Sequence, residues 1–257
     1  NEVDYFAISF VQNAKDMNNA RKLLDGYKGK LIAKIEKFDA VANIDEIIEA
    51  SDGIMVARGD LGIEVPYYDV PTIQKMLIKK ANLKGIPVIT ATQMLLSMTQ
   101  NERATRAEIS DVANAVLDGT DVVMLSEESA VGEDPINVVD TMHNIIAKTE
   151  GIYNYDKQYE MPYLDEFDVI QATVTKLADD LKANGILAIT SSGKSALKMS
   201  RYRPRTPIFT FTHKKKVLNS LTAIWGVEPI GIIKEAQASK MFQKMLKSLD
   251  EIGKLKK

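Results

Sequence analysis

The chain contains no cysteine, which excludes disulfides, thiolate metal ligands and a cysteine nucleophile. It carries a formal net charge of only -2, which argues against nonspecific nucleic-acid binding as its main role. It also lacks an apolar run long enough to cross a bilayer, so we expect no membrane partner. The absence of cysteine is compatible with a reducing cytosol, and we expect a cytoplasmic location.

What is present is an α/β pattern in the first part of the 257 residues, residues 1–152. Short apolar segments rich in Ile, Val and Ala alternate with amphipathic helical segments, which is typical of a parallel sheet. Such a sheet belongs either to a (β/α)8 barrel or to a doubly wound fold, and five strands alone cannot close a barrel. The predicted strands are residues 5–11, 31–35, 53–56, 87–92 and 122–126, and the predicted helices are residues 14–24, 43–50, 70–84, 104–117 and 136–150.

A second α/β pattern fills residues 169–257. Between the two patterns, residues 153–168 are aromatic, acidic and non-periodic, which predicts a linker. The second pattern predicts strands at residues 186–190, 208–212 and 228–233 and helices at residues 169–184, 195–201 and 236–249. The basic run at residues 213–216 is interpreted as a solvated turn.

Charged side chains follow two neighbouring strands of the first part. Lys34 and Glu36 are two residues apart, so they share one face of a strand. Alone, this pair fits a structural salt bridge as well as a site. Asp60 follows the next strand, and two nearby carboxylates suit Mg²⁺ or Mn²⁺, with Lys34 neutralising charge on a group beside the metal.

Polar residues also follow the remaining strands. Gly59 leaves the backbone bare beside Asp60, which suits either ligand approach or a tight turn. Thr92 ends a predicted strand, where its hydroxyl fits either the strand itself, substrate binding or proton relay. Ser126 and Glu128 follow the last strand of the first part and suit either a solvated loop or a proton network.

A loop of small residues lies between a strand and a helix of the second part. Hydroxyls, a glycine and a lysine at a helix start favour an anion site over a plain loop, although the spacing is not that of a P-loop. The residues of this loop are Thr190, Ser191, Ser192, Gly193, Lys194 and Ser195.

Four long motifs give the chain a clear resemblance to pyruvate kinase. They are residues 34–36 (Lys-Ile-Glu), 52–62 (Asp-Gly-Ile-Met-Val-Ala-Arg-Gly-Asp-Leu-Gly), 91–95 (Ala-Thr-Gln-Met-Leu) and 110–119 (Ser-Asp-Val-Ala-Asn-Ala-Val-Leu-Asp-Gly). The resemblance implies part of a TIM-type (β/α)8 barrel at residues 1–152, namely strands four to eight, a linker at 153–168, and an incomplete three-layer α/β C-terminal domain at 169–257.

The resemblance also implies a reaction, the glycolytic transfer of phosphoryl from phosphoenolpyruvate to ADP, giving pyruvate and ATP. Lys34 matches the lysine that stabilises the transferring group, and Glu36 and Asp60 match the carboxylates that hold Mg²⁺ or Mn²⁺. Gly59, Asp60 and Thr92 match substrate-binding positions, and Ser126 and Glu128 keep the residues of the proton network. The loop at 190–195 matches the site of a sugar-phosphate effector, whose identity varies in the family.

The family further implies K⁺ as a cofactor and a homotetramer. By the resemblance, three barrel strands, an inserted domain and the potassium site precede residue 1, and further strands follow Lys257. We therefore expect the 257 residues alone to be inactive. Two alternatives stay open: a Mg²⁺-dependent lyase or aldolase that forms a pyruvate enolate without ADP, and an inactive chain that retains only effector binding.

Overall fold

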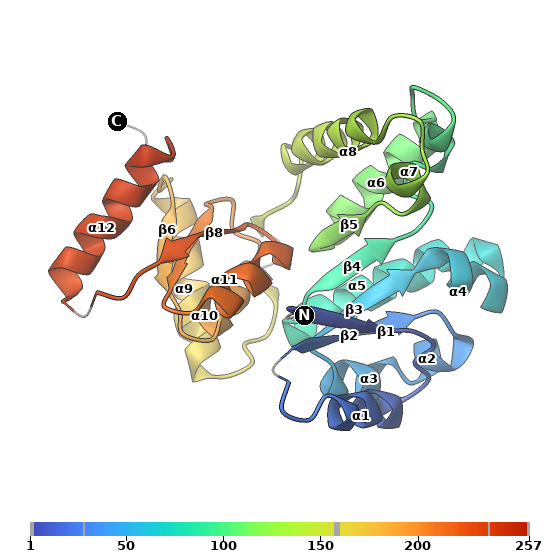
Figure 1. Cartoon of the computed structure of the whole chain (residues 1–257), viewed down its shortest axis with the longest axis horizontal. Coiled ribbons are helices and arrows are strands. Elements are labelled where there is room, and N and C mark those ends of the chain that lie inside the picture. The colour runs from blue at the N-terminus through green and yellow to red at the C-terminus, as the bar shows by residue number, and fades with distance from the viewer. Residues whose placement is uncertain (1–2, 28, 157–159, 236, 256–257) are drawn as a thin grey trace. The chain divides into compact units, whose positions relative to one another are not determined.

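The computed structural model describes residues 3–27, 29–156, 160–235 and 237–255, and it divides into two compact units. The boundary between these units lies between Asn154 and Tyr155. We call them unit 1 and unit 2 and describe each by itself (Figure 1). None of the described helices is both long and apolar enough to cross a bilayer.

Unit 1 contains a sheet of five parallel strands in the order β1-β2-β3-β4-β5. This order follows the chain without a reversal, which is the order of a barrel segment and not that of a doubly wound sheet. The parallel pairing confirms the predicted α/β class. The strands are β1 (Tyr5–Ile8), β2 (Lys30–Ile35), β3 (Gly53–Ala57), β4 (Val88–Ala91) and β5 (Val122–Met124).

Helices connect these strands, and residues on β2 show how the sheet separates its two faces. Leu31, Ala33 and Ile35 alternate with Ile32 and pack into a core with helices α1, α3 and α5. Ile32 contributes to a smaller cluster on the opposite face. The helices of unit 1 are α1 (Ala14–Leu23), α2 (Phe38–Ala42), α3 (Ile44–Ala50), α4 (Arg58–Glu64), α5 (Val70–Lys84), α6 (Arg106–Asp118), α7 (Glu127–Ala130) and α8 (Pro135–Glu150), with 3-10 turns η1 (Tyr67–Asp69) and η2 (Leu96–Thr99).

The start of α6 forms a capping box between Thr105 and Glu108. Thr105 Oγ1 accepts a hydrogen bond from the Glu108 amide at 3.2 Å, and Glu108 Oε2 accepts one from the Thr105 amide at 2.8 Å. Ser97 also donates to the Glu108 carboxylate. Burial raises the pKa of Glu108, but the hydrogen bonds from Ser97 and Thr105 outweigh this effect, so its pKa is lowered.

Unit 2 contains a parallel sheet in the order β6-β7-β8, with helices on both faces. Ile208 of β7 packs with α10 residues, while Phe209 and Phe211 pack with Met245 of α12, so the unit has three layers. Its elements are α9 (Glu166–Asp180), β6 (Ile186–Ile189), α10 (Lys194–Arg201), β7 (Ile208–Thr212), α11 (Lys215–Ser220), η4 (Leu221–Ala223), β8 (Val227–Ile232) and α12 (Ala238–Glu251).

The end of the predicted linker is not an isolated segment. Helix α9 begins at Glu166, and Asp168, the last residue of that linker, is completely buried. Its Oδ2 accepts hydrogen bonds from Arg201 Nη1 at 3.0 Å and from the Tyr202 hydroxyl at 2.8 Å. Arg201 also binds the carbonyl of Pro162. A buried ionic group thus ties the segment before α9 to the core of unit 2.

Three further differences concern short elements. The sequence analysis did not predict α2, α4 or α7, each of which starts within three residues of a strand end. The basic run expected as a turn continues into α11, which begins at Lys215. The predicted start of the last helix, Ala236, lies outside the described residues, and α12 is described from Ala238.

Candidate active site

The residues predicted to carry chemistry in unit 1 gather at one edge of its sheet. Lys34 lies near the end of β2 and Glu36 follows it, while Asp60 lies in α4 after β3. Thr92 follows β4, and Glu128 lies in α7 after β5. Because all five strands are parallel, these residues share the carboxyl edge, where barrel enzymes place their active sites.

Lys34 and Glu36 form an ion pair at this edge. The Lys34 Nζ lies 2.5 Å from Glu36 Oε1 and donates a hydrogen bond to Ser9 Oγ at 2.9 Å. Glu36 is 1% exposed, and its Oε2 accepts a hydrogen bond from the Phe10 amide at 2.8 Å. Its Oε1 pairs with the Lys34 ammonium and has no further hydrogen-bond partner within the described residues. One buried oxygen therefore retains acceptor capacity.

The exposed Asp60 carboxylate and Glu36 both act on the ammonium of Lys37. A hydrogen bond to Glu64 raises the pKa of Lys37, and the charges of Glu64, Glu36 and Asp60 add to the rise against the opposing effect of burial. The two carboxylates thus direct negative potential at one region. The described residues contain no group of three or more His, Cys, Asp or Glu side chains that suits a metal. Mg²⁺ fits two carboxylates when substrate and water oxygens complete its shell.

Thr92 joins the loop after β4 to the start of α4. Its Oγ1 accepts a hydrogen bond from the Gly59 amide at 2.8 Å and lies 2.6 Å from the carbonyl of Ala91. Gly59 has no left-handed backbone; instead, Thr92 and Gln93 do, with φ of 71° and 53°. Non-glycine residues rarely adopt this conformation, so neighbouring groups must hold the loop.

Glu128 binds backbone amides on both sides of the strand edge. Its side chain is 1% exposed. Oε1 accepts hydrogen bonds from the amides of Met94 and Leu95, each at 3.1 Å, and Oε2 accepts one from the Ser126 amide at 2.8 Å. Three amide donors therefore engage the carboxylate, which links the loop after β4 to the start of α7.

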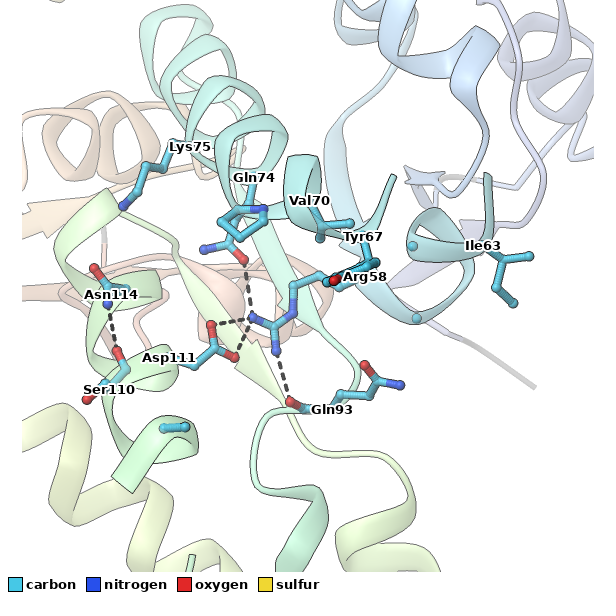
Figure 2. Close-up of a pocket in the computed structure, with 14 residues that line it drawn as sticks. Arg58, Ile63, Tyr67, Val70, Gln74, Lys75, Gln93, Ser110, Asp111 and Asn114 are labelled. Atoms are coloured by element: carbon cyan, nitrogen blue, oxygen red, sulfur yellow. Dashed lines mark hydrogen bonds and ion pairs between the residues drawn. The ribbon is translucent and has the colours of Figure 1, made fainter. Parts of the chain in front are cut away.

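Arg58 is a central residue that the sequence analysis missed. It is the first residue of α4, is 9% exposed and lines a cavity of about 730 Å³ (Figure 2). Its guanidinium contacts Asp111 of α6, with Nη1 at 2.6 Å from Oδ2, and donates to Thr92 O and Gln93 O at 2.9 and 3.1 Å. The available signal was a cation placed directly after a fully buried strand, where a partner is required.

The predicted anion loop lies in unit 2, between β6 and α10. Thr190 is buried, and its Oγ1 accepts a hydrogen bond from the Gly193 amide at 2.9 Å. Gly193 has a left-handed backbone with φ of 86° and precedes α10. Lys194 and Ser195 begin that helix, while Ser191 and Ser192 remain exposed. The loop thus folds back on itself through its own hydroxyl.

Comparison with known proteins assigns both units. The family model "Pyruvate kinase, barrel domain" matches residues 1–139, and the model "Pyruvate kinase, alpha/beta domain" matches residues 168–257. A solved structure of a pyruvate kinase from Cryptosporidium parvum has a TM-score of 0.95 and 37% identity, covering 99% of this chain and 55% of that chain. These matches confirm the predicted fold class, a partial barrel followed by an α/β domain.

Curated relatives give the same assignment. A pyruvate kinase of Clostridium acetobutylicum is 48% identical over 236 residues, covering 89% of this chain and 50% of the relative. One from Lactobacillus delbrueckii subsp. bulgaricus is 43% identical over 263 residues, covering 99% and 45%. The chain spans about half the length of the curated relatives that it matches. On both family models and on these relatives, the chain belongs to the pyruvate kinase family.

Proposed function

We propose that this chain supplies the phosphoryl-transfer edge of a pyruvate kinase, which moves phosphoryl from phosphoenolpyruvate to ADP. The observation that carries this proposal is the Lys34–Glu36 pair, in which a partly exposed ammonium lies beside a buried carboxylate with a spare acceptor oxygen. Phosphoryl transfer needs positioning and charge neutralisation more than covalent participation, and the pair supplies both.

Lys34 neutralises charge as the reaction proceeds. The bond from the enol oxygen to phosphorus breaks, and a terminal phosphate oxygen of ADP forms the new bond, leaving pyruvate enolate and ATP. The Lys34 ammonium, 25% exposed at the strand edge, stabilises the transferring group and the enolate. The enolate then gains a proton at its methylene carbon and becomes pyruvate.

The segments after β3, β4 and β5 serve substrate binding and proton delivery in this proposal. Gly59, Asp60 and Thr92 bind substrate, and the hydroxyls of Thr92 and Ser126 relay the proton. Glu128 contributes to this network through the amides that it holds, since its hydrogen-bond partners within the described residues are backbone amides. Its role is therefore to position the Thr92 loop and Ser126.

Glu36 and Asp60 are the residues that would hold Mg²⁺ or Mn²⁺. The spare Oε1 of Glu36 and the exposed Asp60 carboxylate fit a hard cation that also takes substrate oxygens. When bound, the metal supplies positive charge beside the phosphoryl and enolate oxygens. Family membership further supports a K⁺ requirement, a cytoplasmic location and a homotetramer as parts of the same proposal.

Unit 2 supplies an effector site in this proposal. The loop of Thr190, Ser191, Ser192, Gly193, Lys194 and Ser195 would bind a sugar phosphate or nucleotide, because it joins hydroxyls and an ammonium at the start of α10. In this proposal residues 1–152 carry out catalysis and residues 169–257 carry out regulation.

The Lys34→Met substitution, made in the full-length protein, tests the proposal. We expect the rate of ADP-dependent pyruvate formation to fall by about 10³-fold, the scale of losing a key charge at the transition state. Lys30→Met is the matched control, since Lys30 lies on the same strand and face but at the opposite end, and its rate should stay within about threefold of wild type. Mn²⁺ binding measured by electron paramagnetic resonance should persist in both variants.

The alternatives give different results in the same assay. Pyruvate formation without ADP would indicate a lyase or aldolase. Sugar-phosphate binding without turnover would indicate a chain that retains only effector binding. Near-normal turnover by Lys34→Met would contradict the role of Lys34.

A further inference from the structure

The loop after β4 has a backbone conformation that its own residues do not favour. Thr92 and Gln93 are consecutive non-glycine residues with φ of 71° and 53°. A β-branched threonine is especially disfavoured there, because its Cβ substituents crowd the backbone. The conformation matters because it presents Thr92 Oγ1 to the Gly59 amide at 2.8 Å. Some other group must select this conformation.

Arg58 is placed to select it. Its Nη2 donates to the carbonyls of Thr92 and Gln93 at 2.9 and 3.1 Å, and its Nε lies 3.3 Å from the Thr92 carbonyl. One planar guanidinium therefore binds two successive carbonyls of the left-handed pair. A carbonyl turned away by a relaxed backbone would leave these buried donors without acceptors, which is costly.

The position of the guanidinium is fixed from the opposite side. Asp111 of α6 contacts Nη1 through both oxygens, at 2.8 and 2.6 Å, and Gln74 of α5 accepts from Nη1 at 3.3 Å (Figure 2). The charge of Arg58 is thus balanced inside the protein, and its donors point at protein acceptors. This arrangement suits a residue that orders the site and not one that binds a phosphate.

We infer that Arg58 is a positioning residue that holds Thr92 and Gln93 in the conformation that the reaction needs. The inference rests on the proposed function, since it assigns Arg58 a role through Thr92. Glu128 holds the next two residues of the loop, Met94 and Leu95, by their amides. Arg58 binds carbonyls and Glu128 binds amides, so the loop is fixed through both kinds of backbone group.

Arg58→Lys separates the guanidinium from its charge. A lysine keeps the positive charge opposite Asp111, but its ammonium lacks the planar fork that binds two carbonyls together. Arg21→Lys makes the same chemical change at the half-exposed pair with Asp52 in the same unit. Ile47→Ala, in a buried position of α3, controls for loss of stability without contact to the loop.

Two measurements on the full-length protein test the inference. For Arg58→Lys we expect the KM for phosphoenolpyruvate to rise at least about tenfold, while the KM for ADP changes less than about twofold. Hydrogen exchange at the Gly59 amide should accelerate by about tenfold or more, because its acceptor Thr92 is released. Neither control should change the KM for phosphoenolpyruvate or exchange at Gly59 relative to the rest of unit 1.

Contrary outcomes are distinct. An unchanged KM for phosphoenolpyruvate, with a loss of stability like that of Ile47→Ala, would reduce Arg58 to a structural residue and overturn the inference. Unchanged exchange at Gly59 would overturn it as well. If Arg58→Lys does not fold, Asp111→Asn, which removes the counter-charge, should show the same pattern at smaller size, and its failure to do so counts against the inference. If the wild type transfers no phosphoryl, the proposed function fails, while exchange still reports whether Arg58 holds the loop.

Discussion

Glu128→Gln distinguishes a proton-transfer role from a positioning role at the strand edge. The substitution preserves the shape of the side chain and replaces one carboxylate oxygen by an amide nitrogen. A glutamine side chain cannot keep all the hydrogen bonds of Glu128, because both carboxylate oxygens accept from backbone amides. Whichever way the new amide turns, its nitrogen faces at least one N–H donor.

The magnitude follows from these three bonds. The better orientation keeps oxygen toward Met94 and Leu95 and loses the bond from Ser126. The lost bond to a charged group costs about 2 kcal/mol, and the two remaining bonds weaken by about 1 kcal/mol each as the acceptor becomes neutral. The expected loss in the free energy of unfolding is about 4 kcal/mol, and the melting temperature should fall by ~10 °C.

The assay is urea unfolding followed by far-ultraviolet circular dichroism, with turnover measured at a temperature where both proteins are folded. Glu127→Gln is the matched control, since Glu127 is the exposed neighbour in α7 and its loss should cost less than about 0.5 kcal/mol. A Glu128→Gln protein of unchanged stability whose turnover falls by about 100-fold would refute the positioning role and restore Glu128 as a proton-transfer group.

Three further predictions address other contacts. Arg201→Met leaves the fully buried Asp168 without its ionic partner and should destabilise unit 2 by about 3–5 kcal/mol, measured by urea unfolding with the fluorescence of the single tryptophan. Gly119→Ala places a Cβ 2.7 Å from Asn82 Nδ2 at a φ of 94°, so the free energy of unfolding should fall by about 2 kcal/mol. Glu108, whose pKa is lowered on folding, adds stability that is fully present above its unfolded pKa of 4.5 and is lost as the pH falls through the folded pKa. Glu108→Gln should therefore flatten the rise of the free energy of unfolding with pH in the range below the unfolded pKa.

The first two of these predictions have matched controls. Lys176→Met breaks an exposed pair in unit 2 and should cost less than about 1 kcal/mol. Gly62→Ala lies in helical backbone with its nearest neighbour 3.7 Å away, so it should be neutral or stabilising. Equal effects in variant and control would contradict the assigned contact.

The regular elements were predictable because their signals are local. Helix α5 was predicted at residues 70–84 and strand β7 at 208–212, which are their bounds in the structure. Helix α5 ends at the left-handed Gly85, and α6 starts at the Thr105 capping box. Hydrophobic periodicity and caps depend on a few neighbouring residues, so a sequence displays them directly.

The contacts that order the site were not predictable in the same way. Arg58 and Asp111 are 53 positions apart, and Glu128 is 34 positions from Met94. No local pattern joins such residues; the parallel sheet brings them together at one edge. The same holds for Asp168, which lies in the predicted linker and binds Arg201, 33 positions away. The aromatic and acidic composition of residues 153–168 predicted a linker, but Asp168 is buried because it pairs with Arg201.

Residue type also fails to separate reacting groups from supporting groups at this edge. Glu36 and Glu128 are both 1% exposed carboxylates that follow a strand, and the resemblance gives both a role in the site. Their partners differ, because Glu128 uses both oxygens on backbone amides, whereas Oε1 of Glu36 faces only the Lys34 ammonium, at 2.5 Å. A carboxylate oxygen has two lone pairs, so Oε1 of Glu36 can pair with Lys34 and still bind a ligand. In the proposed function, ligand binding therefore falls to Glu36, whereas Glu128, like Arg58, orders the Thr92 loop.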